Sequence, residues 1–100
     1  MNIQIHSVKF DADKKLLDFV DQKVNKLSKF SNEIIAVEVF LRLDKDQEKE
    51  NKLVEIKVEY PPRAPLFAKK QSKTFEEATD NVIEALKKQI TRQKEKMRGK

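Results

Sequence analysis

The last 27 residues of this chain, 74–100, carry the pattern of a single long helix. Apolar residues recur there every three or four positions, the spacing of one face of an α-helix. These are Phe75, Ala78, Val82, Leu86, Ile90 and Met97, with Ile83 at the edge. Thr74 and Glu77 fit a capping box, which predicts that the helix begins here. A helix of this length spans roughly 35 Å. We therefore expect its end to lie at the rim of so small a domain or to project past it.

An earlier segment, 14–29, predicts a second amphipathic helix. Asp13 precedes it, and its carboxylate can accept hydrogen bonds from the first turn. Ser31 and Asn32 end the pattern. The expected buried stripe consists of Leu16, Val20, Val24 and Leu27, widened by Leu17, Phe19 and Phe30.

Apolar and polar residues alternate in three further segments, as in half-buried strands. The first is short and contains Ile3 and Ile5. The second is 34–43, and its apolar face consists of Val37, Val39, Leu41 and Leu43. The third is 54–60, and its apolar face consists of Val54, Ile56, Val58 and Tyr60. Segment 44–51 has no apolar residue and reads as a solvated connection. The prolines of 61–65 must leave the sheet, and 66–72 is predicted to return as a fourth strand.

The order β-α-β-β-β-α predicts an α+β fold with a four-stranded mixed sheet. The first helix forms a right-handed crossover between parallel strands, and the last three strands form an antiparallel meander. Both helices should pack on one face, an arrangement like that of a double-stranded-RNA-binding domain. We expect residues 1–100 to form one domain whose last few residues are flexible.

Composition argues against catalysis and for an anionic partner. The chain has no cysteine, one glycine, one histidine and a net charge of +5. The lack of cysteine excludes disulfides and thiolate metal sites, and one glycine cannot build a glycine-rich phosphate loop. His6 lies alone on the outward face of its strand, so we predict no enzyme activity, cofactor or metal. No secretory leader or membrane-length apolar run is evident, so we expect a cytoplasmic protein, monomeric on its own.

Positive charge is concentrated on both helices. The last helix begins with acids and ends with Lys87, Lys88, Arg92, Lys94, Lys96, Arg98 and Lys100 against Glu95 alone. The helix dipole favours such sorting but acts only over the terminal turns, so seven bases exceed it. On the first helix, Lys15, Lys23, Lys26 and Lys29 share one flank, which alone would be an ordinary solvated face. Together the two flanks predict a phosphate-binding patch.

The sheet argues against base stacking on single-stranded RNA. Phe40 and Tyr60 are predicted to lie on opposite faces, whereas a stacking platform clusters its aromatic residues. A double-stranded-RNA-binding domain is closer in fold, but such domains place lysines at the start of their last helix. Glu76, Glu77 and Asp80 occupy that position here. Binding must therefore come from the opposite end of the helix.

Two stretches resemble the ribosome hibernation-promoting factors, which include the ribosome-associated inhibitor A proteins. The first comprises Phe19-Val20, Lys23-Val-Asn-Lys26-Leu27 and Phe30; the second comprises Asp80-Asn-Val-Ile83 and 86–96. The chain departs from the family at 74–76, where Thr-Phe-Glu replaces a frequent Asp-Met-Tyr, and at Ala85, which replaces a frequent lysine. Because it ends at Lys100, it resembles the short form.

The resemblance implies a bacterial factor of stress and stationary phase that binds the small ribosomal subunit near the decoding centre. There it would block messenger and transfer RNA by steric occlusion. The implied ribosomal RNA contacts are Lys23, Lys26, Lys29, Lys87, Lys88, Arg92, Lys94 and Lys96, with Lys88 and Arg92 foremost. A second hibernation factor is a possible partner. Whether ribosomes pair into dimers is left open by the sequence.

Two other functions are compatible with the residues themselves. One is general binding of double-stranded RNA through the same basic flanks. The other is a protein–protein module whose basic patch meets an acidic partner, since the acidic half of the last helix and the charged segment 44–51 also offer binding surfaces.

Overall fold

The computed structural model describes residues 1–45 and 49–98, with side chains through 95. The predicted order β-α-β-β-β-α is confirmed. The elements are β1 (Asn2–Ser7), α1 (Lys14–Phe30), β2 (Ala36–Leu43), β3 (Lys52–Glu59), β4 (Leu66–Ser72) and α2 (Phe75–Arg98). Two predictions lie outside the described residues: the flexible last residues and the placements of the Lys96 and Met97 side chains.

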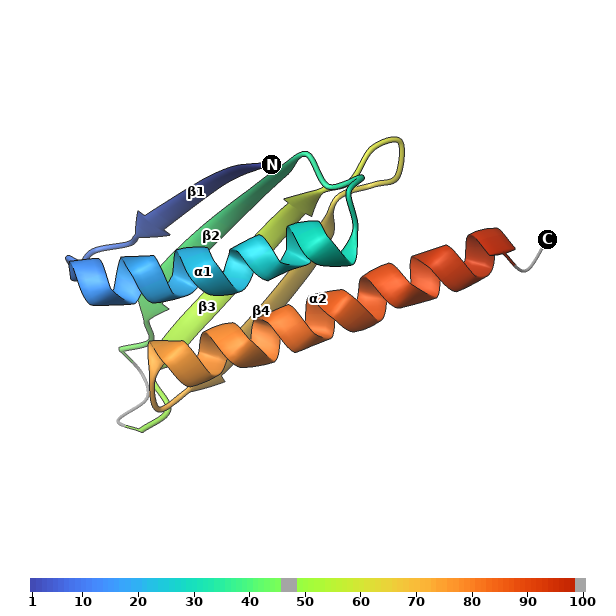
Figure 1. Cartoon of the computed structure of the whole chain (residues 1–100). Coiled ribbons are helices and arrows are strands. Elements are labelled where there is room, and N and C mark those ends of the chain that lie inside the picture. Colours follow the sequence, from blue (N-terminus) through green and yellow to red (C-terminus); the bar gives the residue numbers. More distant parts are fainter. Residues whose placement is uncertain (46–48, 99–100) are drawn as a thin grey trace.

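The four strands form one mixed sheet in the order β1-β2-β3-β4 (Figure 1). β1 and β2 are parallel, with Ile3 opposite Val37, so α1 is the predicted crossover between them. β2, β3 and β4 form the antiparallel meander. The fourth strand is confirmed as Leu66–Ser72, although its sequence alternates only weakly.

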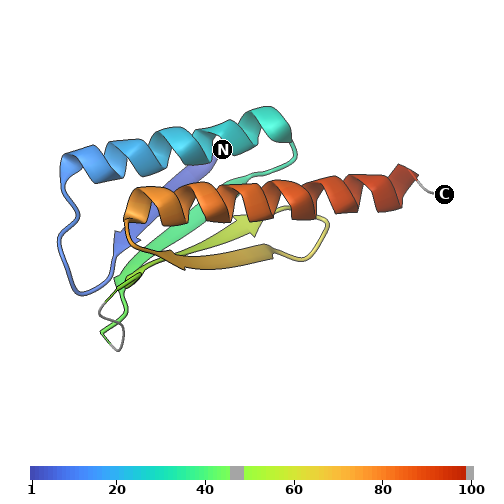
Figure 2. The same cartoon turned by 90° about the horizontal axis from the view of Figure 1, so that it is seen from below.

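Both helices cover the same face of the sheet, and the core lies between them and the strands (Figures 1 and 2). Most residues of the predicted stripes are buried: Val20, Val24 and Leu27 from α1, and Phe75, Ala78, Val82, Ile83, Leu86 and Ile90 from α2. Leu16, Leu17, Phe19 and Phe30, also predicted for the first stripe, are only partly buried. From the sheet side come Val37, Val39, Leu41, Val54, Ile56, Val58 and Tyr60. Burial of this apolar surface is the main force that holds the helices on the sheet.

Leu43 corrects the predicted core. The alternation places it with Leu41, yet its side chain is 40% exposed whereas Leu41 is fully buried. Leu43 is the last residue of β2 and pairs with Lys52 at the loop end of the β2–β3 hairpin. Period-two patterning identifies the face of a residue but not where the covering layer ends.

Asp13 and Thr74 cap the two helices as predicted, whereas among the described hydrogen bonds Glu77 accepts from a side-chain hydroxyl and not from the backbone N–H that a capping box predicts. Asp13 Oδ1 accepts a hydrogen bond from the backbone N–H of Leu16 at 2.9 Å, and Thr74 Oγ1 accepts one from the N–H of Glu77 at 3.0 Å. The Glu77 carboxylate accepts a hydrogen bond from the Ser72 hydroxyl at 3.2 Å, which ties the first turn of α2 to the end of β4. Each cap satisfies a backbone donor that has no partner within the helix.

The last turns of α2 project beyond the sheet and beyond α1, as predicted from its length (Figures 1 and 2). Two side chains hold the helix before it leaves the domain. Gln89 Nε2 donates to the carbonyl of Phe67 at 2.9 Å, and Lys94 Nζ donates to the carbonyl of Phe30 at 2.8 Å. α2 is therefore fixed against β4 at Gln89 and against the end of α1 at Lys94.

Candidate nucleic-acid interface

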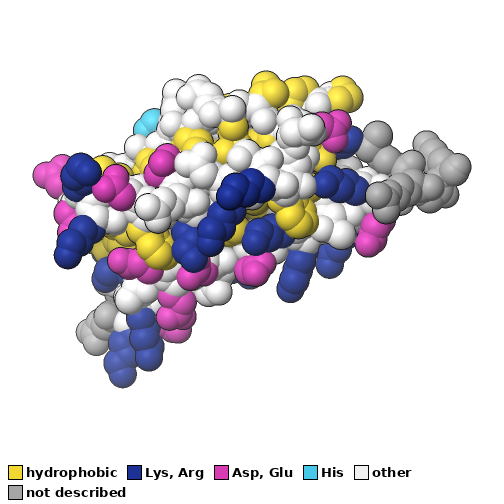
Figure 3. All heavy atoms as spheres, viewed as in Figure 1, with side chains coloured by type: hydrophobic (Ala, Val, Ile, Leu, Met, Phe, Trp, Pro, Cys, Tyr) yellow, Lys and Arg dark blue, Asp and Glu magenta, His cyan; other side chains and the backbone are white. Residues whose placement is uncertain are grey.

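The middle of α2 is bordered by hollows on two sides, and cations line both. The first hollow, which we call the α1/α2 groove, is lined by Lys23, Lys26, Asp80, Ile83, Glu84 and Lys87. On the other side of α2 lies the α2/β4 hollow, whose charged lining residues are Lys70, Glu84, Lys88 and Arg92. A third hollow, nearer the C-terminus, contains Lys87, Lys88, Arg92, Glu84 and Glu95 beside Phe30. The basic side chains of the two helices thus share one surface (Figure 3).

In the α1/α2 groove Lys23, one of the predicted RNA contacts, already forms an ion pair within the protein. Lys23 Nζ lies 3.1 Å from Asp80 Oδ1 and 5.3 Å from the centre of the Phe19 ring. Such a partly exposed ion pair contributes at most about 1 kcal/mol, so a phosphate could replace the carboxylate. Lys26 and Lys87 complete the groove from opposite helices.

Lys88 and Arg92 lie one turn apart on the same face of α2, as predicted, and both line the two hollows that flank this part of the helix. Both side chains are exposed. Within the described part of the chain, neither forms an ion pair with a carboxylate, and the same holds for Lys26, Lys29 and Lys87. Within the described residues these five cations therefore form no internal ion pair that an external phosphate would have to break.

The remaining predicted residues differ in their surroundings. Lys94 donates to the Phe30 carbonyl and its ammonium lies 5.2 Å from the Phe30 ring centre, so it also caps the C-terminal end of α1. Lys29 is exposed in the last turn of α1 and lines none of the three hollows described above. The side chain of Lys96 lies outside the described residues.

Sequence reasoning missed Lys70. This lysine belongs to β4, which was predicted only as a return strand, yet it lines the same hollow as Lys88 and Arg92. A signal was present: Leu66 and Ser72 are buried on the helix side, and strand periodicity places Lys70 on that same side. Glu84 was also missed as the acid that all three hollows share.

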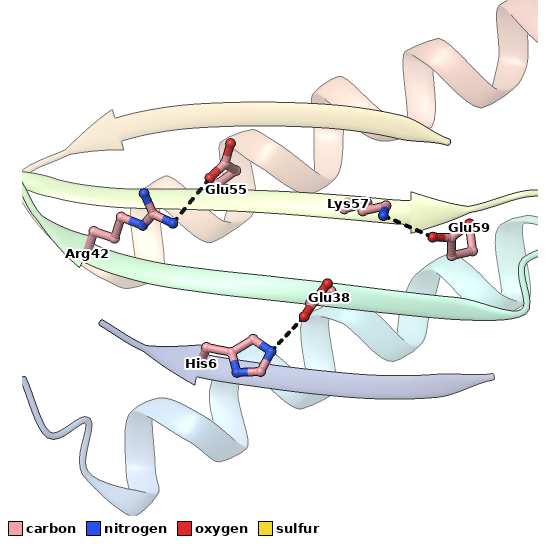
Figure 4. A network of polar contacts seen from close by, with 6 residues as sticks. All are labelled: His6, Glu38, Arg42, Glu55, Lys57 and Glu59. Atoms are coloured by element: carbon pink, nitrogen blue, oxygen red, sulfur yellow. Dashed lines mark hydrogen bonds and ion pairs between the residues drawn. The ribbon is translucent and has the colours of Figure 1, made fainter. Parts of the chain in front are cut away.

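The opposite face of the sheet has a different character (Figure 4). His6 Nε2 lies 2.8 Å from Glu38 Oε2, and the His6 ring stacks on Phe40 with centroids 5.0 Å apart. Phe40 lies here and Tyr60 in the core, so the predicted opposite placement of these rings is confirmed. Among the described residues there is no group of three or more potential metal ligands, and no helix among them is long and apolar enough to cross a membrane.

The fold and this surface together define a small α+β module with a cationic helix-bearing face. The family model described as Sigma 54 modulation protein / S30EA ribosomal protein matches residues 3–98, so the chain belongs to this ribosome-associated family. This membership confirms the resemblance inferred from the two helices. It supports a role in ribosome binding and translation regulation.

Solved structures show the same fold. A ribosomal subunit interface protein from Coxiella burnetii superposes with a TM-score of 0.82 at 20% identity, over 94% of this chain and 98% of that chain. The N-terminal domain of Protein Y from Thermus thermophilus gives a TM-score of 0.76 at 20% identity, over 92% and 98% of the two chains. No curated protein sequence matches significantly.

Proposed function

We propose that this protein is a ribosome hibernation factor that binds ribosomal RNA of the small subunit near the decoding centre. In that position it blocks access of messenger and transfer RNA. The observation that carries the proposal is a set of cations on α1 and α2, namely Lys26, Lys87, Lys88 and Arg92, that form no ion pair within the described residues, in a chain of the S30EA family. The family description includes a ribosomal protein, and the Coxiella burnetii structure is named a ribosomal subunit interface protein; both names support the ribosome as the partner.

Phosphate binding by this surface follows from its charges. Ammonium and guanidinium groups on two neighbouring helices neutralise backbone phosphates and release condensed counterions, which gives affinity without base recognition. Specificity then arises from shape, because the ridge of α2 must fit between folded RNA segments. The mechanism is steric occlusion in the cytoplasm, with no bond made or broken by the protein.

The salt dependence of binding to purified small subunits tests the proposal. If about five phosphates are neutralised, log Kd should rise with log salt at a slope of about 4. Prior binding of the protein should also prevent transfer RNA from binding to the same subunits. A slope near zero, or normal transfer RNA binding at saturating protein, would contradict the proposal.

Two controls separate the alternative functions. A generic RNA duplex should displace the protein from subunits only at far higher concentration, because the start of α2 carries Glu76 and Glu77, which repel phosphates. Displacement at equal concentration would instead favour a general double-stranded-RNA binder. Pull-down of a protein partner that resists ribonuclease, with no ribosomal RNA recovered, would favour a protein–protein module.

A further inference from the structure

The most positive hollow on the helix-bearing face is not the one between the two helices. The α1/α2 groove has three cations and two acids, a net charge of +1. The hollow nearer the C-terminus of α2 also has three cations and two acids, again +1. The α2/β4 hollow has three cations and Glu84 alone, a net charge of +2. An anion is therefore drawn at least as strongly to the β4 side of α2 as to the α1 side.

The third cation of this hollow, Lys70, is positioned by the sheet. It pairs with Val54 of β3 in the antiparallel register, and Val54 is fully buried beneath the helices. Lys70 therefore points to the helix side, and because β4 is the edge strand, its side chain stays exposed beside α2. Ala85 also lines the hollow, where its short side chain fills little space.

The geometry of the hollow is fixed by the packing around it. Leu86 and Ile90 of α2 are fully buried against the core, and Gln89 bonds the Phe67 carbonyl at 2.9 Å. A site held by packed elements loses little conformational entropy when a ligand binds. Lys88 and Arg92 on α2 and Lys70 on β4 therefore line a hollow whose walls are held by packed elements.

We infer that the α2/β4 hollow is a second phosphate-binding site, anchored by Lys70, so that α2 lies between two backbone segments of one folded RNA. One segment follows the α1/α2 groove and the other follows the β4 side. A helix with its side chains is about 10–12 Å across, and the two sites lie on opposite flanks of α2, so one extended backbone does not fill both. This inference rests on the proposed function and adds a strand residue to the RNA-binding surface.

The neighbouring lysine provides a matched control. Lys69 is also exposed, but it pairs with Glu55 of β3 and points to the face of the sheet that bears no helices. Lys70→Gln and Lys69→Gln remove the same charge from adjacent residues of the same strand. Neither side chain belongs to the buried core, so both variants should keep the wild-type thermal midpoint.

Equilibrium binding of both variants to purified small ribosomal subunits tests the inference. Lys70→Gln should weaken binding about three- to tenfold and lower the magnitude of the salt slope by about one. Lys69→Gln should bind as the wild type does. If the wild type binds and the two variants behave alike, the inference is overturned while the proposed function stands. If the wild type does not bind, the proposed function is overturned and this inference with it.

Directed cleavage of RNA provides a second measurement that is independent of any loss of affinity. The chain has no cysteine, so single variants Asn81→Cys, in the α2/β4 hollow, and Gln22→Cys, one turn before Lys26 on α1, can each carry a hydroxyl-radical-generating iron chelate. On bound subunits the two positions should cleave two different segments of ribosomal RNA. Cleavage confined to one segment, or none from position 81, would overturn the two-segment arrangement.

Discussion

The two faces of the sheet carry charge in different ways. On the face without helices, basic groups lie beside acids of the same face: Arg42 beside Glu55 at 3.9 Å, and Lys57 beside Glu59 at 3.2 Å (Figure 4). On the helix-bearing face, Lys88 lies one turn from Arg92, and both line hollows with further cations. One face balances its charge internally, and the other keeps an excess.

This difference supports the helix-bearing face as the proposed binding surface. Like charges four residues apart destabilise a helix by a few tenths of a kcal/mol, whereas opposite charges stabilise it by a similar amount. Lys88 and Arg92 therefore weaken α2 slightly when no anion is present. Opposite charges within reach on the other face give the arrangement expected of a surface that contributes to stability alone.

The largest difference between the faces should appear in the free energy of unfolding when one side chain of each face is truncated. Leu86 is fully buried, so Leu86→Ala should lower the free energy of unfolding by about 2–5 kcal/mol through lost burial and cavity formation. Phe40 is only partly buried on the other face, and Phe40→Ala should lower it by less than half as much. Urea denaturation of the two variants measures both effects, and an equal loss would show that the second face contributes a core of its own.

The next contrast concerns binding. Lys88→Glu with Arg92→Glu should weaken binding to small subunits at least about a hundredfold, or about 2.7 kcal/mol, because two phosphate contacts become repulsions. Lys45→Glu with Lys69→Glu makes the same change in net charge at exposed residues away from the α2 hollows. If filter binding at fixed salt shows equal losses, net charge and not the α2 surface determines affinity.

A cap variant should separate stability from binding. Thr74→Ala removes the hydroxyl that accepts from the N–H of Glu77 at 3.0 Å, and should lower the free energy of unfolding by about 1 kcal/mol. Thr74→Ser should retain most of it. Because the cap lies at the acidic end of α2, binding to subunits at 25 °C should be unchanged in both. A loss of affinity in the alanine variant would mean that the start of α2 takes part in recognition.

The smallest expected effect tests the acid that all three hollows share. Glu84→Gln removes a negative charge beside Lys88 and Lys87, so affinity for small subunits should rise about two- to fivefold at low salt and less at high salt. Glu55→Gln, on the other face, should leave affinity unchanged. If Glu84→Gln binds no better than the wild type, RNA does not approach this part of α2.

Much of this arrangement could be predicted because it depends on local chemistry. Asp13 and Thr74 marked both helix starts, and the spacing from Phe75 to Ile90 identified the buried stripe of α2. The resemblance seen in the two helices is confirmed by a family model that matches residues 3–98. The same reasoning predicted that Lys88 and Arg92 share one face.

Other features needed the packed molecule. Leu43 fits the alternation of its strand, but the end of the helix layer leaves it exposed. Lys94 was expected at the RNA, and the structure places its ammonium at the Phe30 carbonyl, 64 residues earlier in the chain. Strand periodicity gives the face of Lys70, but the sheet register and the packing of α2 place it in one hollow with Lys88 and Arg92.

By itself the sequence determined the elements, their order, the helix caps and the faces that carry positive charge, because each depends on residues within a few positions of one another. Tertiary structure decided which of those charged side chains lie close together. Distances between side chains on α1, α2 and β4 depend on how the helices pack across the sheet, and burial of the shared core fixes that packing. Which cations line one hollow, and which acid lies among them, follows from that packing alone.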